Sequence, residues 1–357
     1  MGTEPLRKLN IGYWPLSPTF TSAGDRRRLV FWAQARGHTI VTNLNQSVDV
    51  IVASEISDFN SPYFVRKQGP IVLDLVDAYL SPLNSFDDLA RGLVKKMTGD
   101  LSGGVKPFSH HVRDFCINSS AVICSSSEQE EIIKRYNINT HVSLDSHHEI
   151  PFIDPPNPGT LISDKHRILW EGQPATIAGV KIISPALSKL SKTTILSLDF
   201  VTDEKYYQFL NKYIERSTLS LLEKDLSQLI DHLNIIPWTP KNLVECAKES
   251  SIAMIPINLS VPMQKLKPEN RLLIMWRLGL PCLTSPSPAY VRVARQAGVV
   301  AAVCNTLEDW FVNFNRLLND PGFAFDEVMA GQNYLRENHN QTILLKKWDL
   351  AFESVMG

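Results

Sequence analysis

A chain of 357 residues is longer than one hydrophobic core usually serves, so two domains are expected. Its 44% hydrophobic and 20% charged residues are typical of a soluble globular protein and exclude the disordered and fibrous classes. The formal net charge of -1 provides no overall positive field for a polyanion, so nucleic acid is not an expected partner.

The amino-terminal residues and the cysteines indicate the cellular compartment that we expect. Residues 1–14 lack the apolar core of a signal peptide, and no run approaches the roughly 18 apolar residues that span a bilayer. The five cysteines are widely spaced in apolar surroundings, as expected of buried thiols in a reducing compartment, and no pair has metal-ligand spacing. We therefore expect a cytoplasmic protein without a metal site.

Short apolar runs alternate with helix-like intervals through the first 150 residues. The runs that we interpret as strands are 9–14, 38–43, 48–54, 70–76, 120–126 and 140–146. The intervals that suit helices are 24–37, 85–97 and 127–136. This alternation predicts a parallel sheet covered on both faces, so residues 1–150 are assigned to an N-terminal Rossmann-like domain.

Four prolines within residues 149–159 interrupt the alternation, and neither a helix nor a central strand can continue through them. We assign 151–159 to a Pro-rich interdomain linker. The alternation then restarts, with expected strands at 166–172, 193–201, 234–238, 252–257, 281–285 and 299–304 and a long helix over 203–231. Residues 160–330 are therefore assigned to a second doubly wound domain. Residues 331–357 form a helical segment, for which packing back on the N-terminal domain is one option.

The stretch 266–290, LKPENRLLIMWRLGLPCLTSPSPAY, combines a polar start with a helix that is apolar on nearly every face. Pro268 suits a first helical turn, so the helix is predicted to begin near Lys267. Lys267 and Arg271 then lie one turn apart, beside free backbone N–H groups, an arrangement that favours a phosphate. The alternative is a solvated helix start whose charges pair with each other.

Several segments together resemble the nucleotide-sugar glycosyltransferases of the GT-B fold, of the family 4 or group 1 kind. The stretch 267–290 is similar to their donor-binding helix, which ends in Gly-x-Pro and a strand, as GLPCLTS does at 279–285. AVICSSSEQEEIIKRY at 121–136 resembles the end of their amino-terminal domain. ILWEGQPATIAGVKIISPALSKL at 168–190 resembles the first strand and phosphate loop of their second domain, and IVLDLVDAYL at 71–80 resembles a segment with paired aspartates.

The resemblance implies two Rossmann-like domains that face each other across a cleft, with the acceptor bound on 1–150 and the donor on 160–330. It implies a glycosyltransferase that moves a sugar from a nucleotide-activated donor to a saccharide or lipid-linked acceptor in surface polysaccharide or glycoconjugate biosynthesis. Neither a metal nor another cofactor is implied. The open alternatives are a nucleotide-sugar epimerase of the same fold and a non-catalytic nucleotide-binding protein. A basic stretch at Lys95, Lys96 and Lys106 leaves peripheral contact with the inner face of a membrane as a further option.

The resemblance and the helix start imply a set of donor-binding residues, each of which follows a predicted strand in the chain. They are Gly172, Gly179, Trp238, Thr239, Lys267, Glu269, Asn270 and Arg271. Core packing is the plainer alternative for Trp238. Ile274 stands where the commonest retaining relatives carry a Glu that contacts the donor ribose, so the stereochemical outcome stays open, with Glu269 as a substitute.

We assign two residues to catalysis and three to acceptor binding. Asp77, just past a strand end, is the first choice for a base that takes the acceptor proton. Lys181 resembles the cation that stabilises the departing diphosphate. The acceptor-binding candidates are Gly24, Arg26 and His111. The plainer alternatives are helix capping for Asp77 and solvation for Lys181 and Arg26.

Overall fold

The computed structural model describes residues 7–43, 45–61, 64, 69–81, 85–158, 165–208, 214–226 and 232–357. The chain divides into two compact units. Unit 1 comprises Met1–His147, Leu266–Pro268 and Asn340–Gly357, and unit 2 comprises His148–Lys265 and Glu269–His339. Among the helices of the described ranges, none is both long and apolar enough to cross a bilayer.

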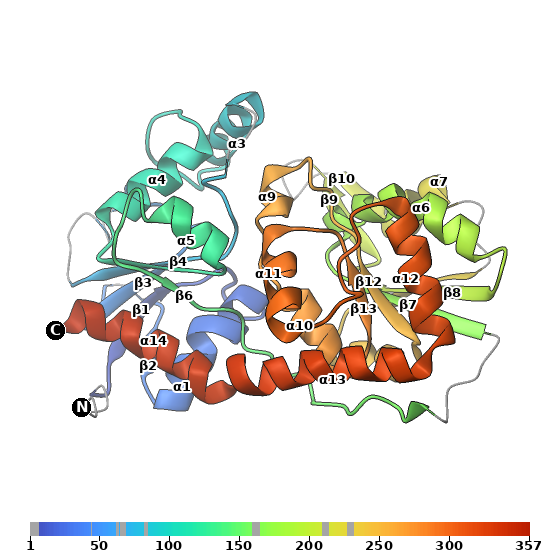
Figure 1. Ribbon diagram of the computed structural model, residues 1–357. Helices are drawn as coiled ribbons and strands as arrows, with labels where there is room; N and C mark the ends of the chain where they lie inside the picture. The colour runs from blue at the N-terminus through green and yellow to red at the C-terminus, as the bar shows by residue number, and fades with distance from the viewer. Residues whose placement is uncertain are drawn as a thin grey trace. The chain divides into compact units, whose positions relative to one another are not determined.

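Unit 1 contains a six-stranded, all-parallel sheet in the order β2-β1-β3-β4-β5-β6 (Figure 1). The strands are β1 (Asn10–Trp14), β2 (Thr39–Val41), β3 (Val50–Ser54), β4 (Ile71–Leu75), β5 (Ala121–Cys124) and β6 (Thr140–Val142). Every residue of β3, β4 and β5 is buried, as expected for parallel strands covered on both faces. The strand order reverses between β1 and β3, which places a topological switch point at their carboxyl ends.

Helices cover both faces of this sheet. They are the π-helical turn η1 (Asp25–Leu29), α1 (Val30–Arg36), α3 (Ser85–Met97), α4 (Phe108–Asn118), α5 (Ser127–Ile133) and α14 (Gln341–Met356). One core cluster joins the sheet to α4 and α5 through residues such as Phe108, Phe115 and Ile133. Against the other face, Trp32 of α1 packs on Trp348 and Phe352 of α14, so the last helix of the chain completes unit 1.

Unit 2 contains a five-stranded, all-parallel sheet in the order β11-β8-β7-β12-β13. Its strands are β7 (Lys165–Glu171), β8 (Ile195–Thr202), β11 (Leu233–Pro237), β12 (Ile252–Ile255) and β13 (Cys282–Thr284). The antiparallel pair β9 (Lys205–Gln208) and β10 (Ile214–Ser217) forms a separate small sheet. The switch point of unit 2 lies between β7 and β12.

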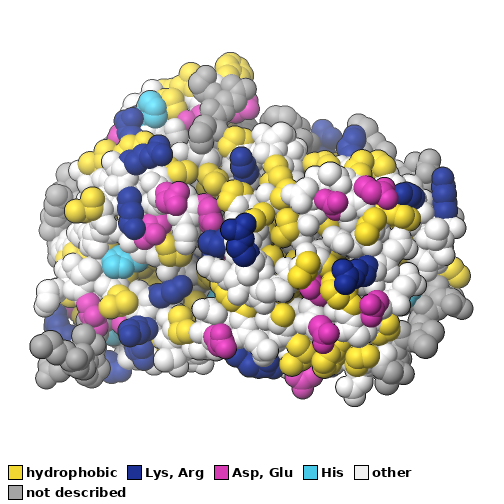
Figure 2. Space-filling view, viewed as in Figure 1, with side chains coloured by type: hydrophobic (Ala, Val, Ile, Leu, Met, Phe, Trp, Pro, Cys, Tyr) yellow, Lys and Arg dark blue, Asp and Glu magenta, His cyan; other side chains and the backbone are white. Residues whose placement is uncertain are grey.

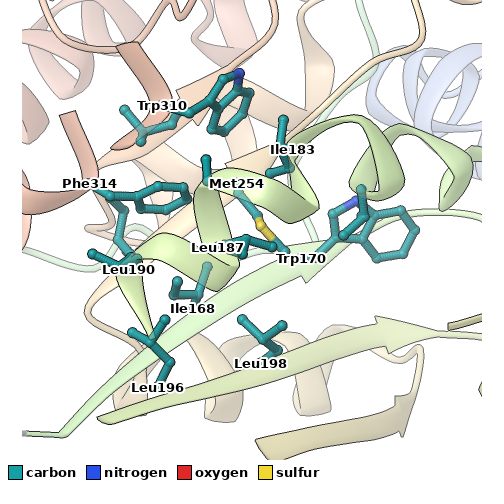
Figure 3. Packing of buried hydrophobic residues seen from close by; sticks show 14 of the residues in the cluster. Ile168, Trp170, Ile183, Leu187, Leu190, Leu196, Leu198, Met254, Trp310 and Phe314 are labelled. Atoms are coloured by element: carbon teal, nitrogen blue, oxygen red, sulfur yellow. The ribbon is translucent and has the colours of Figure 1, made fainter. Parts of the chain in front are cut away.

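The helical elements of unit 2 follow the strands in the order that a doubly wound sheet requires. They are η3 (Pro174–Thr176), α6 (Ala178–Leu190), α7 (Thr218–Leu226), α8 (Pro240–Glu249), α9 (Pro262–Lys265), α10 (Asn270–Arg277), α11 (Pro288–Ala297), α12 (Leu307–Asn319) and α13 (Pro321–Asn338). Figure 3 shows Ile183, Leu187 and Leu190 of α6 in one buried cluster with Ile168 and Trp170 of β7 and with Trp310 and Phe314 of α12. This core buries Ile168 and Trp170 in the second half of β7.

The prediction of two parallel α/β sheets is confirmed, and three predicted segments need correction. Residues 203–231 do not form one long helix, because 205–208 and 214–217 pair as strands and only Thr218–Leu226 is helical among the described residues. Residues 299–304 make only an isolated bridge between Thr284 and Val303. The predicted linker 151–159 is described as far as residue 158 and belongs to unit 2, because Ile153 exchanges hydrogen bonds with α10 and α13.

The carboxyl-terminal segment divides at a different point from the one expected. Helix α13 belongs to unit 2, where Gln332 donates to the carbonyl oxygens of Ile153 and Trp276. Helix α14 belongs to unit 1, where Trp32 and Arg36 both donate to the Asp349 carboxylate. The boundary therefore falls between His339 and Asn340 rather than at residue 330.

Candidate functional site

At the carboxyl end of β7 in unit 2, two side chains contact Glu171, the last residue of that strand. Arg271 donates to the Glu171 carbonyl oxygen, and its Nε lies 3.4 Å from Glu171 Oε2. Trp238 Nε1 donates to Glu171 Oε1 over 2.9 Å. The Arg271 guanidinium also lies 5.0 Å from the centre of the Trp170 ring. A cation and an aromatic side chain are thus held together at one edge of the sheet.

Gly172 follows Glu171 with φ +154°, a conformation that L side chains rarely adopt. A Cβ at this position would also lie 3.1 Å from the Arg271 guanidinium and 3.2 Å from Thr176 Oγ1. The absence of a side chain lets the backbone turn directly beneath Arg271. The sequence resemblance selected Gly172, Trp238 and Arg271, and the structure brings all three together; it did not select Glu171, although this residue stands directly before Gly172.

Two buried hydroxyl groups at the same edge of the sheet lack hydrogen-bond partners within the described residues. They are Thr202 Oγ1, at the end of β8, and Ser287 Oγ, just before α11. A buried polar group without a partner is costly, so such a group often marks a place that a ligand or water completes. Neither residue was selected from the sequence, because a lone Ser or Thr carries no distinguishing pattern.

Helix α10 begins later than predicted. Its first residue is Asn270, with Glu269 as the N-cap, so Lys267 and Arg271 are not one helical turn apart. Proline disfavours helical geometry in the residue before it, and Pro268 thereby keeps Lys267 out of the helix. Lys267 is counted with unit 1, whereas Arg271 is counted with unit 2.

The remaining residues of the α10 start have structural partners. The buried Glu269 carboxylate receives two hydrogen bonds of 3.2 Å from the Arg292 guanidinium. Asn270 is half-buried. Ile274 is buried, so the departure from the family pattern at this position places an apolar side chain where no solvent reaches it.

Two other donor-side candidates, Thr239 and Gly179, have local roles in the structure, and the catalytic candidate Lys181 lies beside the second. Thr239 is the N-cap of α8, where its hydroxyl accepts from Asn242 N over 2.9 Å. Gly179 lies in the first turn of α6, where a Cβ would overlap the carbonyl oxygen of Pro256. Close helix packing therefore accounts for this glycine. Lys181 is exposed on the same helix.

The carboxyl ends of β3 and β4 in unit 1 bring two carboxyl side chains together. Glu55, directly after β3, accepts hydrogen bonds from the backbone N–H groups of Val76 (3.1 Å) and Asp77 (2.8 Å), directly after β4. Lys267 Nζ lies 3.5 Å from Asp77 Oδ1. Glu55 was missed in the sequence, although a Glu that ends the buried run VDVIVAS is a detectable signal.

The environment of this pair favours a protonated carboxyl group. Burial, and then the nearby Asp77 and Asp74 carboxylates, raises the pKa of Glu55 to about 8, against the effect of the Asp77 N–H and Lys267. Burial, together with Glu55 and Asp77, also raises the pKa of the Tyr79 phenol above its ordinary value. A carboxyl group with a raised pKa beside a second carboxyl group is typical of acid–base sites.

The loop after β1 is organised by Asp25. Its carboxylate accepts hydrogen bonds from the backbone N–H groups of Leu16 (2.8 Å) and Ser17 (2.9 Å) and from the Tyr13 hydroxyl (2.6 Å). Gly24 is buried beside this loop, where a Cβ would overlap the Leu16 side chain. Arg26 is half-buried and donates to the Thr21 carbonyl oxygen over 2.6 Å.

A buried ion pair lies behind this loop. Arg28 donates to both oxygens of Asp74, with a shortest distance of 2.6 Å, and also to the Ser143 carbonyl oxygen. Both side chains are almost fully buried. A buried carboxylate needs such a partner, and the pair ties η1 to β4.

His111 lies elsewhere in unit 1, on α4. Its ring is buried, and burial, followed by the positive charge of Lys106, lowers the pKa of His111. The acidic groups near His111 are Asp58 and Asp114. The charged groups near Asp77 are different ones, Glu55 and Lys267. Across the described part of the chain, no three His, Cys, Asp or Glu side chains are placed to share a metal ion.

Comparison with known proteins relates the chain to others through its fold. No protein-family model matches the sequence, and no curated protein matches it in sequence. Among solved structures, a glycosyltransferase from Rickettsia africae aligns with a TM-score of 0.60 and 11% identity, covering 98% of this chain and 99% of that chain. WaaG, a glycosyltransferase involved in lipopolysaccharide biosynthesis, aligns with a TM-score of 0.57 and 11% identity over 98% and 100% of the two chains.

S. aureus TarM, solved in complex with UDP and α-GlcNAc-glycerol, also matches, with a TM-score of 0.56, 10% identity and 85% of this chain covered. The chain spans about half of TarM, 55% of its length. The chain therefore has the GT-B fold, with its two Rossmann-like units, as the sequence resemblance implied.

Proposed function

We propose that this protein is a glycosyltransferase that moves a sugar from a nucleotide-activated donor to a hydroxyl of a saccharide or lipid-linked acceptor. The observation that carries this proposal is the grouping of Arg271, Trp238 and the open backbone turn at Gly172 at the carboxyl end of β7. In a GT-B fold this edge of a sheet is where ligands bind. The presence of UDP in the structurally similar TarM supports a nucleotide as the ligand class.

The donor would bind to unit 2 through its diphosphate and its base. Arg271 offers planar N–H donors suited to phosphate oxygens, and these are held at present by Glu171. The Trp238 ring offers a face for a nucleobase. Thr202 and Ser287 would gain hydrogen-bond partners from bound ligand oxygens. A positive group held where the diphosphate leaves would stabilise the charge that develops there. In this proposal Arg271 and Lys181 both have that role.

The acceptor would bind to unit 1, where Asp77 serves as the base. Its carboxylate would take the proton from the acceptor hydroxyl while the oxygen bonds to the anomeric carbon and the bond from that carbon to the diphosphate breaks. Glu55 would hold the Val76–Asp77 backbone in place, and Lys267 would orient the Asp77 carboxylate. Because cationic side chains neutralise the leaving diphosphate in this scheme, we propose that no metal ion or other cofactor is required.

Thermal unfolding with UDP, GDP, ADP, dTDP and CMP, each with and without magnesium, tests the donor site directly. A nucleotide at about 100 times its dissociation constant should stabilise the protein by roughly 2.7 kcal/mol. We expect one nucleotide to do so without magnesium, and the matching nucleotide sugars are then incubated with candidate acceptors and analysed for products. Sugar transfer supports the proposal, epimerised donor points to an epimerase, and binding without turnover points to a non-catalytic protein. No stabilisation by any nucleotide would overturn the donor assignment.

A further inference from the structure

The backbone of Val76 and Asp77, directly after β4, is hydrogen-bonded at all four of its polar groups. Glu55 accepts from both N–H groups, over 3.1 Å from Val76 and 2.8 Å from Asp77. The Val76 carbonyl oxygen accepts from the Ser125 hydroxyl over 2.9 Å. The Asp77 carbonyl oxygen accepts from Tyr79 N over 2.9 Å. Connecting segments are usually more mobile than the sheet, and these bonds fix one such segment at the residue that we propose as the base.

Gln129, in the first turn of α5, holds Ser125 in turn. The side-chain oxygen of Gln129 accepts from Ser125 N over 2.9 Å, and its amide nitrogen lies 3.5 Å from the Val76 carbonyl oxygen. Both side chains are buried, with Ser125 0% and Gln129 3% exposed. Buried polar side chains that bond one another fix a single arrangement of their members. The segment SSSEQEE at 125–131, which lies within the family resemblance, therefore has a structural link to Asp77.

A second glutamate makes the same pair of hydrogen bonds in unit 2. The carboxylate of Glu327, on α13, accepts from Val300 N over 2.9 Å and from Ala301 N over 2.8 Å. The residues that Glu327 holds have apolar side chains, so its bonds shape the chain. The residues that Glu55 holds include a carboxylate beside a lysine, so its bonds also place a charged group.

The Asp77 side chain is oriented by its near neighbours. Lys267 Nζ lies 3.5 Å from Asp77 Oδ1. Figure 2 shows acidic and basic side chains interspersed over the face that it presents. Charges of both signs placed in this way leave little long-range field, so the direction of one carboxylate depends on contacts within a few ångströms.

A proton on Glu55 would let it hold the Asp77 backbone without repelling the Asp77 carboxylate. Burial, and then the charges of Asp77 and Asp74, raises the pKa of Glu55 to about 8, while Lys267 acts against this rise. Two carboxylates this close repel each other, and protonation of one removes the repulsion. A protonated carboxyl group still accepts hydrogen bonds through its carbonyl oxygen.

We propose that Glu55, Ser125 and Gln129 are positioning residues, which form a clamp on the Val76–Asp77 backbone and present the Asp77 carboxylate to the acceptor hydroxyl. Glu55 holds the N–H side of this dipeptide, and the Ser125–Gln129 pair holds the C=O side. The inference rests on the proposed function, in which Asp77 takes the acceptor proton. It adds the residues that act through Asp77 and the neutral form in which Glu55 does so.

Hydrogen exchange on the protein alone tests the clamp without any substrate. Mass spectrometry follows the peptides that cover 71–80 in Glu55→Ala, Ser125→Ala and Gln129→Leu. We expect exchange there to be about tenfold faster in Glu55→Ala, the effect of the lost hydrogen bonds, and faster to a smaller degree in the other two variants. Glu55→Gln should exchange as slowly as the wild type, because its amide oxygen still accepts. Unchanged exchange in all three variants would overturn the clamp.

Transfer kinetics, measured with the nucleotide sugar and acceptor that give product, connect the clamp to the base. The kcat of Glu55→Ala should fall about 10- to 100-fold, because a catalytic group displaced by about 1 Å loses that much. The KM for the nucleotide sugar should not change, since the proposed donor residues lie in unit 2. Glu55→Gln should keep the wild-type kcat at pH 7. Added to Asp77→Asn, Glu55→Ala should lower kcat no further.

Glu327→Ala is the matched control, because it removes the same pair of hydrogen bonds away from Asp77. It should speed exchange at 299–304 and leave both the exchange at 71–80 and kcat as in the wild type. An equal fall of kcat in Glu327→Ala and Glu55→Ala would reduce the effect to a general loss of stability and overturn the positioning role.

The remaining outcomes separate the clamp from the proposed function. Faster exchange in Glu55→Ala with an unchanged kcat would overturn the positioning role, while a low kcat in Asp77→Asn would still support the base. A further loss when Glu55→Ala is added to Asp77→Asn would show that Glu55 acts independently of Asp77, and would also overturn it. A wild-type kcat in Asp77→Asn would remove the base, and this inference with it.

Discussion

Arg271 is bound by Glu171, the residue that ends β7: its guanidinium donates to the Glu171 carbonyl oxygen, and its Nε lies 3.4 Å from the carboxylate. The cation best placed to receive a phosphate thus already has an internal anion as its partner. A nucleotide diphosphate that binds here competes with the Glu171 side chain, and this competition leads to the first two predictions.

Replacing Arg271 with Ala should weaken nucleotide diphosphate binding by about 10- to 100-fold, since a hydrogen bond to a charged group contributes about 1.5–3 kcal/mol. Isothermal titration with the nucleotide found in the thermal panel measures this loss. Arg295→Ala, on the exposed side of α11, removes a comparable charge and should leave binding unchanged. Equal affinity of the Arg271→Ala and wild-type proteins would contradict the donor site.

Replacing Glu171 with Gln should have the opposite effect on the same titration. The amide oxygen of Gln can still accept from Trp238, but the negative charge that competes for Arg271 is gone. We expect diphosphate affinity to rise about fivefold, a gain in the range of a partly exposed ion pair. A fall in affinity would indicate that Glu171 itself contacts the donor.

Replacing Asp77 with Asn should lower kcat for sugar transfer by about 100-fold or more, as the loss of a general base does. Donor affinity should stay the same, because Asp77 belongs to unit 1 and the proposed donor residues to unit 2. Single-turnover rates and nucleotide titrations on the same preparations separate the two effects. Asp87→Asn, on α3, is a matched control for loss of one carboxylate. An unchanged transfer rate in Asp77→Asn would remove Asp77 from the chemistry.

The raised pKa of Glu55 predicts how stability depends on pH. Between its ordinary value of 4.5 and about 8, the folded protein holds a proton on Glu55 that the unfolded chain has released. Stability conferred by this group is therefore greatest at low pH and falls as the pH rises toward 8. Glu55→Gln removes the titration and keeps an acceptor for the Val76 and Asp77 N–H groups.

Urea unfolding at pH 5.5, 7.0 and 8.5 compares the two proteins under otherwise identical conditions. The free energy of unfolding of Glu55→Gln should exceed that of the wild type by a margin that grows with pH. A margin that stays constant across this range would show that Glu55 titrates normally. Histidines contribute equally to both proteins and cancel in the difference.

Replacing Gly179 with Ala distinguishes close packing from phosphate binding. Because a Cβ would overlap the Pro256 carbonyl oxygen, the substitution should lower the free energy of unfolding by about 1–3 kcal/mol. Gly104→Ala, where nothing lies within 4 Å, should have little effect. Nucleotide affinity of any folded Gly179→Ala protein should match the wild type. A stable Gly179→Ala protein that has lost nucleotide binding would restore this glycine to the donor site.

Local sequence pattern was enough to predict most strands and helices, because buried parallel strands are short apolar runs and the helices between them follow the 3.6-residue period. It failed at 203–231, where the segments 205–208 and 214–217 pair with each other as strands. Pairing between strands is a non-local interaction, and a window of sequence does not contain it. The start of α10 was misplaced for a related reason, since Pro268 fits both the first turn of a helix and the segment before it.

The sequence by itself determined the two α/β sheets, the family resemblance and the candidates Gly172, Trp238, Arg271 and Asp77, because each depends on residue type and on position relative to the end of a strand or the start of a helix. Only the tertiary structure decided what these residues touch. Glu171 lies 100 positions from Arg271 in the chain, and Lys267 lies 190 positions from Asp77. Such partners are brought together by the packing of whole strands and helices, and the electrostatic environment that raises the pKa of Glu55 exists only once that packing has excluded water.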